Sequence, residues 1–128
     1  MSSYLNFYIP KGNIEEEKPL LLTSFSRSNE LYSIFYDNLN IAFIGNEENK
    51  YTKLEYSDLE HILDIMDTSI NSVSKRITEL EKYANGNYDI ISEILSLKDY
   101  LEELKENRDY VRFIAFIVAD TTLYCNID

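Results

Sequence analysis

Apolar residues recur at alternating steps of three and four along two long stretches of the chain, residues 57–84 and 87–118. This spacing brings the apolar side chains to one face of an α-helix, and its persistence over more than three heptads is typical of helices that pack as a coiled coil. We therefore predict two long helices, each with a seam of apolar positions. The first seam is Leu59, Leu63, Met66, Ile70, Val73, Ile77, Leu80 and Ala84, and the second is Ile90, Ile94, Leu97, Leu101, Leu104, Arg108, Val111, Ala115 and Val118.

A short linker joins the two stretches. Residues 85–87 read Asn-Gly-Asn, and these residue types tolerate the left-handed backbone conformation that ends a helix. A linker this short makes the two helices antiparallel neighbours. In that register Arg108 lies opposite Asp64 and Asp67, so we predict a structural ion pair between Arg108 and one of these two acids.

The N-terminal part of the chain shows the shorter alternation of β-strands. Leu5, Phe7 and Ile9 alternate with more polar residues, which is typical of a strand with one buried face. Glycine, two prolines and three successive glutamates predict a loop after this strand. The predicted strands are residues 4–9, 20–25, 41–44 and 51–55, with a loop at 10–19 and a turn at 45–49.

Two helix starts carry capping signals. Ser28 precedes residues 29–39, where apolar residues follow a helical spacing, and its hydroxyl can accept a hydrogen bond from a free amide. Ser57 is followed three residues later by Glu60, which is the spacing of a capping box. We therefore predict a short helix capped by Ser28 and a long helix that starts at Ser57.

Together these elements predict a single α+β domain over residues 1–128. Residues 1–56 form a small sheet with one short helix, and residues 57–119 form a long antiparallel, coiled-coil-like helical hairpin. Residues 120–128 are a strand-like tail that could join the sheet. Residues 110–119 are apolar on nearly every side, so we expect this end of the hairpin to be buried all round against the strand-rich part.

The charge of the chain is strongly acidic, with 23 acids against 12 lysines and arginines and a net charge of −11. The acids are spread along the fold: residues 1–56 hold eight acids and five bases, residues 57–84 six and three, and residues 87–118 seven and four. A field of this sign repels nucleic acid and anionic membranes and favours basic protein surfaces, although it can also serve solubility alone. We expect no direct nucleic-acid binding and no membrane association.

Four further features bear on localisation and source. No stretch reaches the roughly 18 uncharged apolar residues of a membrane helix, and the first twelve residues lack the basic start of a secretory signal. The single cysteine, Cys125, excludes an internal disulfide and fits a reducing compartment. The richness in Asn, Ile, Lys, Glu and Tyr is typical of low-GC bacteria and their phages. We expect a cytoplasmic protein that is not secreted.

Residues for catalytic chemistry are scarce. His61 is the only histidine, and Asp58 and Asp64 lie three residues to either side of it, but zinc and di-iron sites draw on more nitrogen or sulfur ligands. Cys125 has no base close in sequence, and a catalytic cysteine would need His61 beside it. We expect no catalytic residue, no metal and no cofactor. A small enzyme that uses His61 or paired carboxylates is the least favoured alternative.

The remaining signal favours protein binding. Tyrosine, which is enriched at interfaces, occurs eleven times. We expect a non-enzymatic protein that binds itself, as a homo-oligomer, or a protein partner through the hairpin and a tyrosine-rich surface. The alternative is an acidic inhibitor that mimics nucleic acid and blocks a basic surface, as a phage counter-defence protein would. The expected partner-binding residues are the tip tyrosines and outer helix positions Tyr83, Tyr88, Ile62, Ile65, Ile91, Leu95 and Tyr100.

Overall fold

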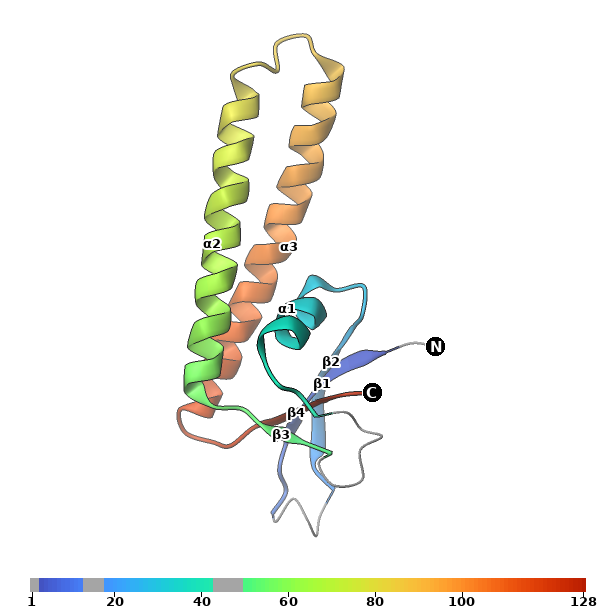
Figure 1. Cartoon of the computed structure of the whole chain (residues 1–128), viewed down its shortest axis with the longest axis vertical. Coiled ribbons are helices and arrows are strands. Elements are labelled where there is room, and N and C mark those ends of the chain that lie inside the picture. The colour runs from blue at the N-terminus through green and yellow to red at the C-terminus, as the bar shows by residue number, and fades with distance from the viewer. Residues whose placement is uncertain (1–2, 13–17, 43–49) are drawn as a thin grey trace.

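The computed structural model describes residues 3–12, 18–42 and 50–128. A four-stranded antiparallel sheet and a short helix lie at one end, and a long helical hairpin rises from them (Figure 1). The predicted α+β fold with a helical hairpin is therefore confirmed.

The sheet combines the two ends of the described chain. Its strands are β1 (Tyr4–Ile9), β2 (Leu20–Ser26), β3 (Thr52–Lys53) and β4 (Tyr124–Ile127), in the order β2-β1-β4-β3. β1 and β2, which correspond to two of the predicted strands, pair as an antiparallel hairpin with a register shift between Phe7 and Tyr8. The C-terminal tail enters as β4 and pairs with both β1 and β3. Leu5 and Phe7 of β1 face Ile127 and Cys125 of β4, so their side chains share the helix side of the sheet.

The strands predicted between the short helix and the hairpin are the least accurate part of the sequence reading. The strand expected at 51–55 is reduced to β3, because α2 (Tyr56–Glu81) begins soon after it. The amide of the buried Leu54, which follows β3, still donates to the carbonyl of Leu123. The strand expected at 41–44 is not formed by Ile41 and Ala42. Both are buried in irregular chain, and the carbonyl of Ala42 accepts a hydrogen bond from the Ile127 amide. Residues 43–44 and the turn at 45–49 lie outside the described residues.

Both predicted helix caps are wrong. Helix α1 (Glu30–Asn38) is capped by Asn29, whose side-chain oxygen accepts from the Leu31 amide at 2.8 Å, while the Ser28 hydroxyl bonds to Ser26 instead. Helix α2 begins one residue before Ser57, and its N-cap residue Glu55 makes no side-chain capping bond. The carbonyl of Glu55 already accepts from the amides of Asp58 and Leu59, so Ser57 lies inside the first turn.

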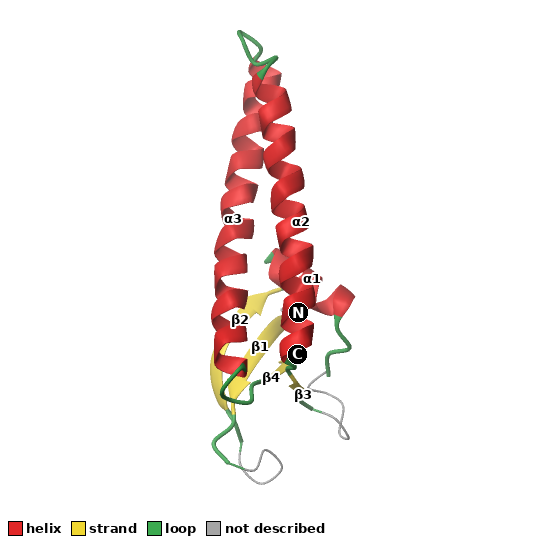
Figure 2. Cartoon of the chain, turned by 90° about the vertical axis from the view of Figure 1, so that its left-hand side faces the viewer, coloured by secondary structure: helices red, strands yellow, loops and turns green. Residues whose placement is uncertain are grey.

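The two long helices, α2 and α3 (Tyr88–Val118), pack side by side along their length as an antiparallel pair (Figure 2). At the tip, Gly86 has a φ of 73°, in the left-handed region. The side chain of Asn87 then caps α3 by accepting from the amides of Asp89 and Ile90 at 3.1 and 3.3 Å. The linker thus ends one helix and starts the next within a few residues, as its sequence predicts.

Two apolar clusters hold this arrangement together. The larger joins the sheet, α1 and the root of the hairpin, where Phe7, Phe35 and Ile114 are fully buried. The smaller lies near the tip and is built on Ile77, Leu80 and Ile94 from the two seams. The hairpin is therefore anchored at its root by the main core and closed at its far end by its own seam.

Replacing Gly86 with alanine should lower the free energy of unfolding by about 1–2 kcal/mol, because an L-residue is disfavoured at positive φ. Crowding is not the reason, since a Cβ at this position would meet nothing within 4 Å. Thermal or urea unfolding followed by circular dichroism measures the loss. The exposed neighbour Asn85 provides the control: Asn85→Ala should change stability by less than about 0.5 kcal/mol. Equal losses in the two variants would show that backbone strain at Gly86 is not the cause.

Candidate interaction surface

The root of α3 exposes large apolar side chains. Val111, Ile114 and Ala115 pack into the main core, but Phe113 and Phe116 are 52% and 74% exposed. The expectation that residues 110–119 are buried all round is therefore wrong. The sheet and α2 each cover one side of this helix, and the third side faces solvent.

A hollow of about 280 Å³ lies beside Phe116, between the roots of the two long helices. Its lining is largely apolar and comes from the start of α2 and the end of α3. Arg112 is the charged residue at its rim. The lining residues are Tyr56, Leu63, Arg112, Ala115, Phe116 and Ala119.

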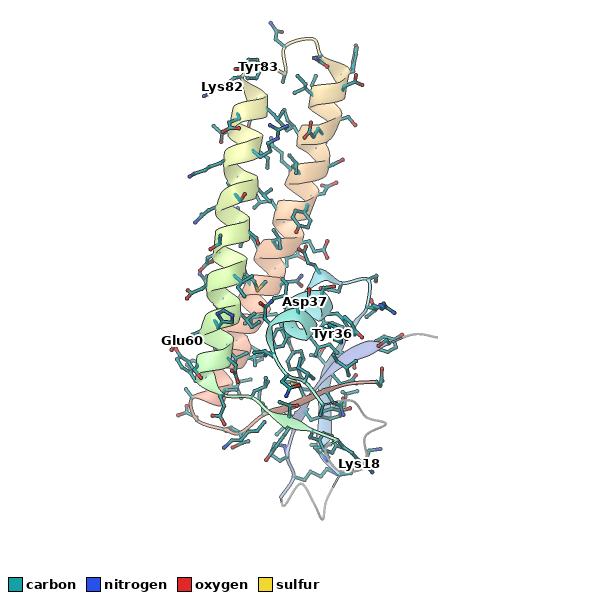
Figure 3. The ribbon with its side chains drawn as sticks, viewed as in Figure 1. Lys18, Tyr36, Asp37, Glu60, Lys82 and Tyr83 are labelled. Atoms are coloured by element: carbon teal, nitrogen blue, oxygen red, sulfur yellow. The ribbon has the colours of Figure 1, made fainter. Side chains whose placement is uncertain are left out.

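The tip end of the hairpin also exposes apolar groups. Tyr83 and Tyr88 flank the linker and are 70% and 86% exposed, and Tyr83 lies at the far end of the molecule in Figure 3. Ile91 and Leu95 follow on α3, and both face solvent. These four predicted partner-binding residues are thus available for contact.

The other three predicted partner-binding residues are not equally available. Ile62 is fully buried in the main core, because the root of α2 turns a second face toward the sheet, so its placement on the outer surface is wrong. Ile65 and Tyr100 are half-buried. The Tyr100 hydroxyl donates to a carboxylate oxygen of Glu30, which ties α3 to α1. Burial and this negatively charged partner raise the pKa of Tyr100 to about 12.

Eight exposed residues form a stripe along the outside of α3, which we call the α3 outer stripe. Each lies one position after a residue of the inner seam, from Ile90 to Ala115, so the stripe has the same alternating spacing. Its ends are apolar and its middle is charged. The members are Ile91, Leu95, Lys98, Glu102, Lys105, Asp109, Arg112 and Phe116.

A second exposed apolar segment lies on β2, at the edge of the sheet. Leu20, Leu21 and Leu22 are all exposed and uncharged, and β1 pairs with only one side of this strand. An edge strand presents unpaired backbone groups that can add a further strand. Lys18 and Arg27, both exposed, stand just before and after the strand and place positive charge at its two ends.

The predicted ion-pair residues meet between the long helices. Arg108 Nη1 lies 3.5 Å from Asp67 Oδ1, and a second pair, Arg76 with Glu93, joins the helices nearer the tip at 3.4 Å. Asp64 instead lies beside His61 at a shallow hollow on the outside of α2. Pairs exposed to this degree contribute at most about 1 kcal/mol each, so their role is to favour one helix register.

The residues considered for catalysis are not assembled into a site. His61 is exposed on α2, whereas Cys125 is fully buried in β4. Burial, with a smaller contribution from the negative charge of Asp58, raises the pKa of the Cys125 thiol to about 12. Within residues 3–12, 18–42 and 50–128, no group of three or more His, Cys, Asp or Glu side chains is placed to hold a metal ion.

The residues that sequence reasoning missed are Phe113 and Phe116. The signal of Phe116 is present in the sequence, because it lies on the α3 outer stripe, which is shifted by one residue from the inner seam. Phe113 lies outside this stripe. Because residues 110–119 are apolar at nearly every position, the sequence does not distinguish the exposed side chains of this segment from the buried ones.

Comparison with known protein families, curated proteins and solved structures found no match. No helix in the described part of the chain is both long and apolar enough to cross a membrane. The exposed apolar groups of α3 and β2 are therefore the features from which function can be argued.

Proposed function

We propose that this chain is a non-enzymatic interaction protein that assembles with itself or with another protein through the outer face of its helical hairpin. The observation that carries the proposal is the exposure of Phe116, at 74%, beside an apolar hollow of about 280 Å³. A large aromatic side chain next to a concave apolar surface has the chemistry of an interface centre.

The extent of the apolar exposure supports the same function. Phe113 and Phe116 lie at the root of α3, and Ile91 and Leu95 lie toward its tip. Single exposed apolar residues are common on any protein surface, but groups of them on one rigid element mark a place where another molecule binds. The hairpin provides that rigidity, because the main core fixes its root and the smaller cluster closes its far end.

The state of the reactive side chains supports a role without catalysis. The Cys125 thiol is buried and its raised pKa keeps it in the unreactive neutral form at physiological pH. His61 is on the surface of α2, and the shallow hollow beside it is lined by Asp64, Ile65, Thr68 and Ser69.

The proposal can be tested with the photo-crosslinking residue p-benzoylphenylalanine in place of Phe116. Illumination in the native host cell should give a discrete covalent adduct whose second component is a protein chain. The matched control carries the same residue in place of Lys75, which is exposed on α2 away from the α3 outer stripe. This control should give no adduct. If both variants remain monomeric after illumination, the proposed function is wrong.

A further inference from the structure

The α3 outer stripe has the spacing of a packing surface although it faces solvent. Its eight residues follow steps of four and three without interruption, from Ile91 to Phe116, and all eight are exposed. At 1.5 Å per residue, the stripe is about 38 Å long. Within the described residues, Lys98, Glu102 and Lys105 make no ion pair in their own chain. The stripe is thus a surface with heptad spacing, in which these three charged residues have no ion-pair partner in their own chain.

The order of the residues along the stripe is complementary to itself when read in the opposite direction. From tip to root the order is two apolar residues, Lys98, Glu102, Lys105, Asp109, an arginine and a phenylalanine. A second α3 laid antiparallel, with the centre between residues 103 and 104, places Lys98 opposite Asp109 and Glu102 opposite Lys105. The same alignment places Ile91 opposite Phe116 and Leu95 opposite Arg112, the one pair of the stripe in which a charged residue meets an apolar one. Two-fold symmetry repeats each of these pairs.

We propose that the α3 outer stripe binds a second copy of this chain, antiparallel, to form a two-fold symmetric dimer. The inference rests on the proposed function and names its partner. Opposite charges that face each other across a helix pair select the partner and the orientation. A parallel pair in the same register would instead place each lysine and each acid against its own copy.

The net charge of the chain makes this self-recognition specific to α3. Two copies that each carry −11 repel one another over most of their surfaces. The four central residues of the stripe, Lys98, Glu102, Lys105 and Asp109, instead have equal numbers of positive and negative charges. A basic partner protein would fit an acidic stripe better than this neutral, alternating one.

In the same arrangement, side chains of the second copy lie beside the hollow at the hairpin root. In the antiparallel pair, Ile91 and Tyr88 of the second copy lie level with Phe116 and Ala119, which line the hollow. Tyr88 is 86% exposed in the single chain. The tip of each hairpin would therefore cover the root of the other, and the exposed apolar groups at both ends would be buried together.

One like-charge contact in this arrangement is unfavourable. Asp99 and Glu106 flank the stripe on one side, are both exposed, and would face each other across the pair. Glu106→Lys should therefore tighten the dimer by several fold. Glu60→Lys makes the same change in net charge on the outside of α2, away from α3 (Figure 3), and should have a smaller effect. Equal effects of the two variants would show that Asp99 and Glu106 do not meet.

The decisive experiment is sedimentation equilibrium of the full chain with a charge swap. The wild-type protein should form dimers. Lys98→Glu and Asp109→Lys should each weaken the dimer roughly tenfold or more, because each change creates two like-charge contacts across the symmetry axis. The double variant carrying both changes should regain wild-type affinity within about threefold. The two positions lie about 16 Å apart in one helix, so their rescue of each other must occur between chains.

Asp109 makes surface contacts to Arg108 and Arg112 at 3.9 and 3.8 Å, so melting temperatures must show that the variants remain folded.

Three results separate failure of this inference from failure of the proposed function. If the dimer affinity is the same in the wild type and in all three variants, the α3 interface is wrong, and the exposed edge of β2 becomes the next candidate interface. A monomeric wild-type protein that crosslinks through position 116 to a different protein would overturn the dimer and leave the proposed function standing. A monomer with no adduct would overturn both.

Discussion

Phe7→Ala should lower the free energy of unfolding by about 3–5 kcal/mol, a large part of the stability of a domain of this size. Phe7 is fully buried at the centre of the main core. Its ring meets those of Phe25 and Phe35 edge to face, with centroids 6.0 and 5.4 Å apart, and it lies 6.2 Å from the ring of Tyr110. Truncation would leave a cavity at the point where the sheet, α1 and the hairpin root meet.

Urea unfolding in dilute solution, followed by far-ultraviolet circular dichroism, measures this loss. Phe113→Ala is the matched control, because it removes the same atoms from a side chain that is half exposed. It should cost less than about 1 kcal/mol, since the position has no cavity to open. If the two variants lose similar stability, Phe7 is not the centre of the core.

The second large effect concerns Cys125 at alkaline pH. Burial raises the pKa of its thiol from 9.0 to about 12, so the folded protein keeps the proton that the unfolded chain releases. A raised pKa in the folded state contributes stability that is fully present below pH 9 and is lost as the pH rises toward 12. The loss amounts to about 4 kcal/mol, from about 1.4 kcal/mol for each pKa unit.

Unfolding free energies between pH 8 and pH 11 test this expectation. The wild-type protein should lose stability steeply over that range, and Cys125→Ala should lose less, although its stability at pH 8 is lower because of the smaller side chain. Tyr100, whose pKa is also raised, remains in both proteins and contributes a slope common to both. Identical slopes would mean that folding does not raise the pKa of the Cys125 thiol.

Thiol labelling gives an independent readout of the same burial. At pH 8 a disulfide reagent such as dithionitrobenzoate should react with Cys125 orders of magnitude more slowly in the native protein than in urea, because the reactive form is the thiolate. Rapid labelling of the native protein would show that β4 opens readily or is not central to the sheet.

The hairpin could be predicted from the sequence because its information is local and repeated. Each seam specifies one helix face many times over, and the linker at 85–87 fixes the chain reversal with residues suited to it. The antiparallel register also follows, since a short linker leaves one way for the seams to meet. The β1–β2 pairing is predictable for the same reason, because both strands alternate and are close in sequence.

The errors lie where a local signal has competitors or where another element decides burial. Ser28 and Asn29 are both competent caps, and Asn29 is selected with the help of Asn107 of α3, whose side-chain amide donates to it at 3.1 Å. Ile62 precedes the seam residue Leu63 and is not part of the seam, yet it is buried because the root of α2 also faces the main core. Phe116 is apolar and exposed, because no described element covers that side of α3. Each of these outcomes depends on elements that are distant in sequence from the residue concerned.

The placement of β4 has a consequence for how the protein is made. Leu5 pairs with Ile127 and Asn6 with Asn126, so an inner position of the sheet is filled by a strand that follows the helical hairpin in the chain. The hairpin can close as soon as α3 has left the ribosome, because its contacts join segments that are near in sequence. β1 must instead wait until the hairpin and β4 have been synthesised before its second partner exists. Its apolar residues, Leu5 and Phe7 among them, therefore lack this partner until residues 124–127 have left the ribosome.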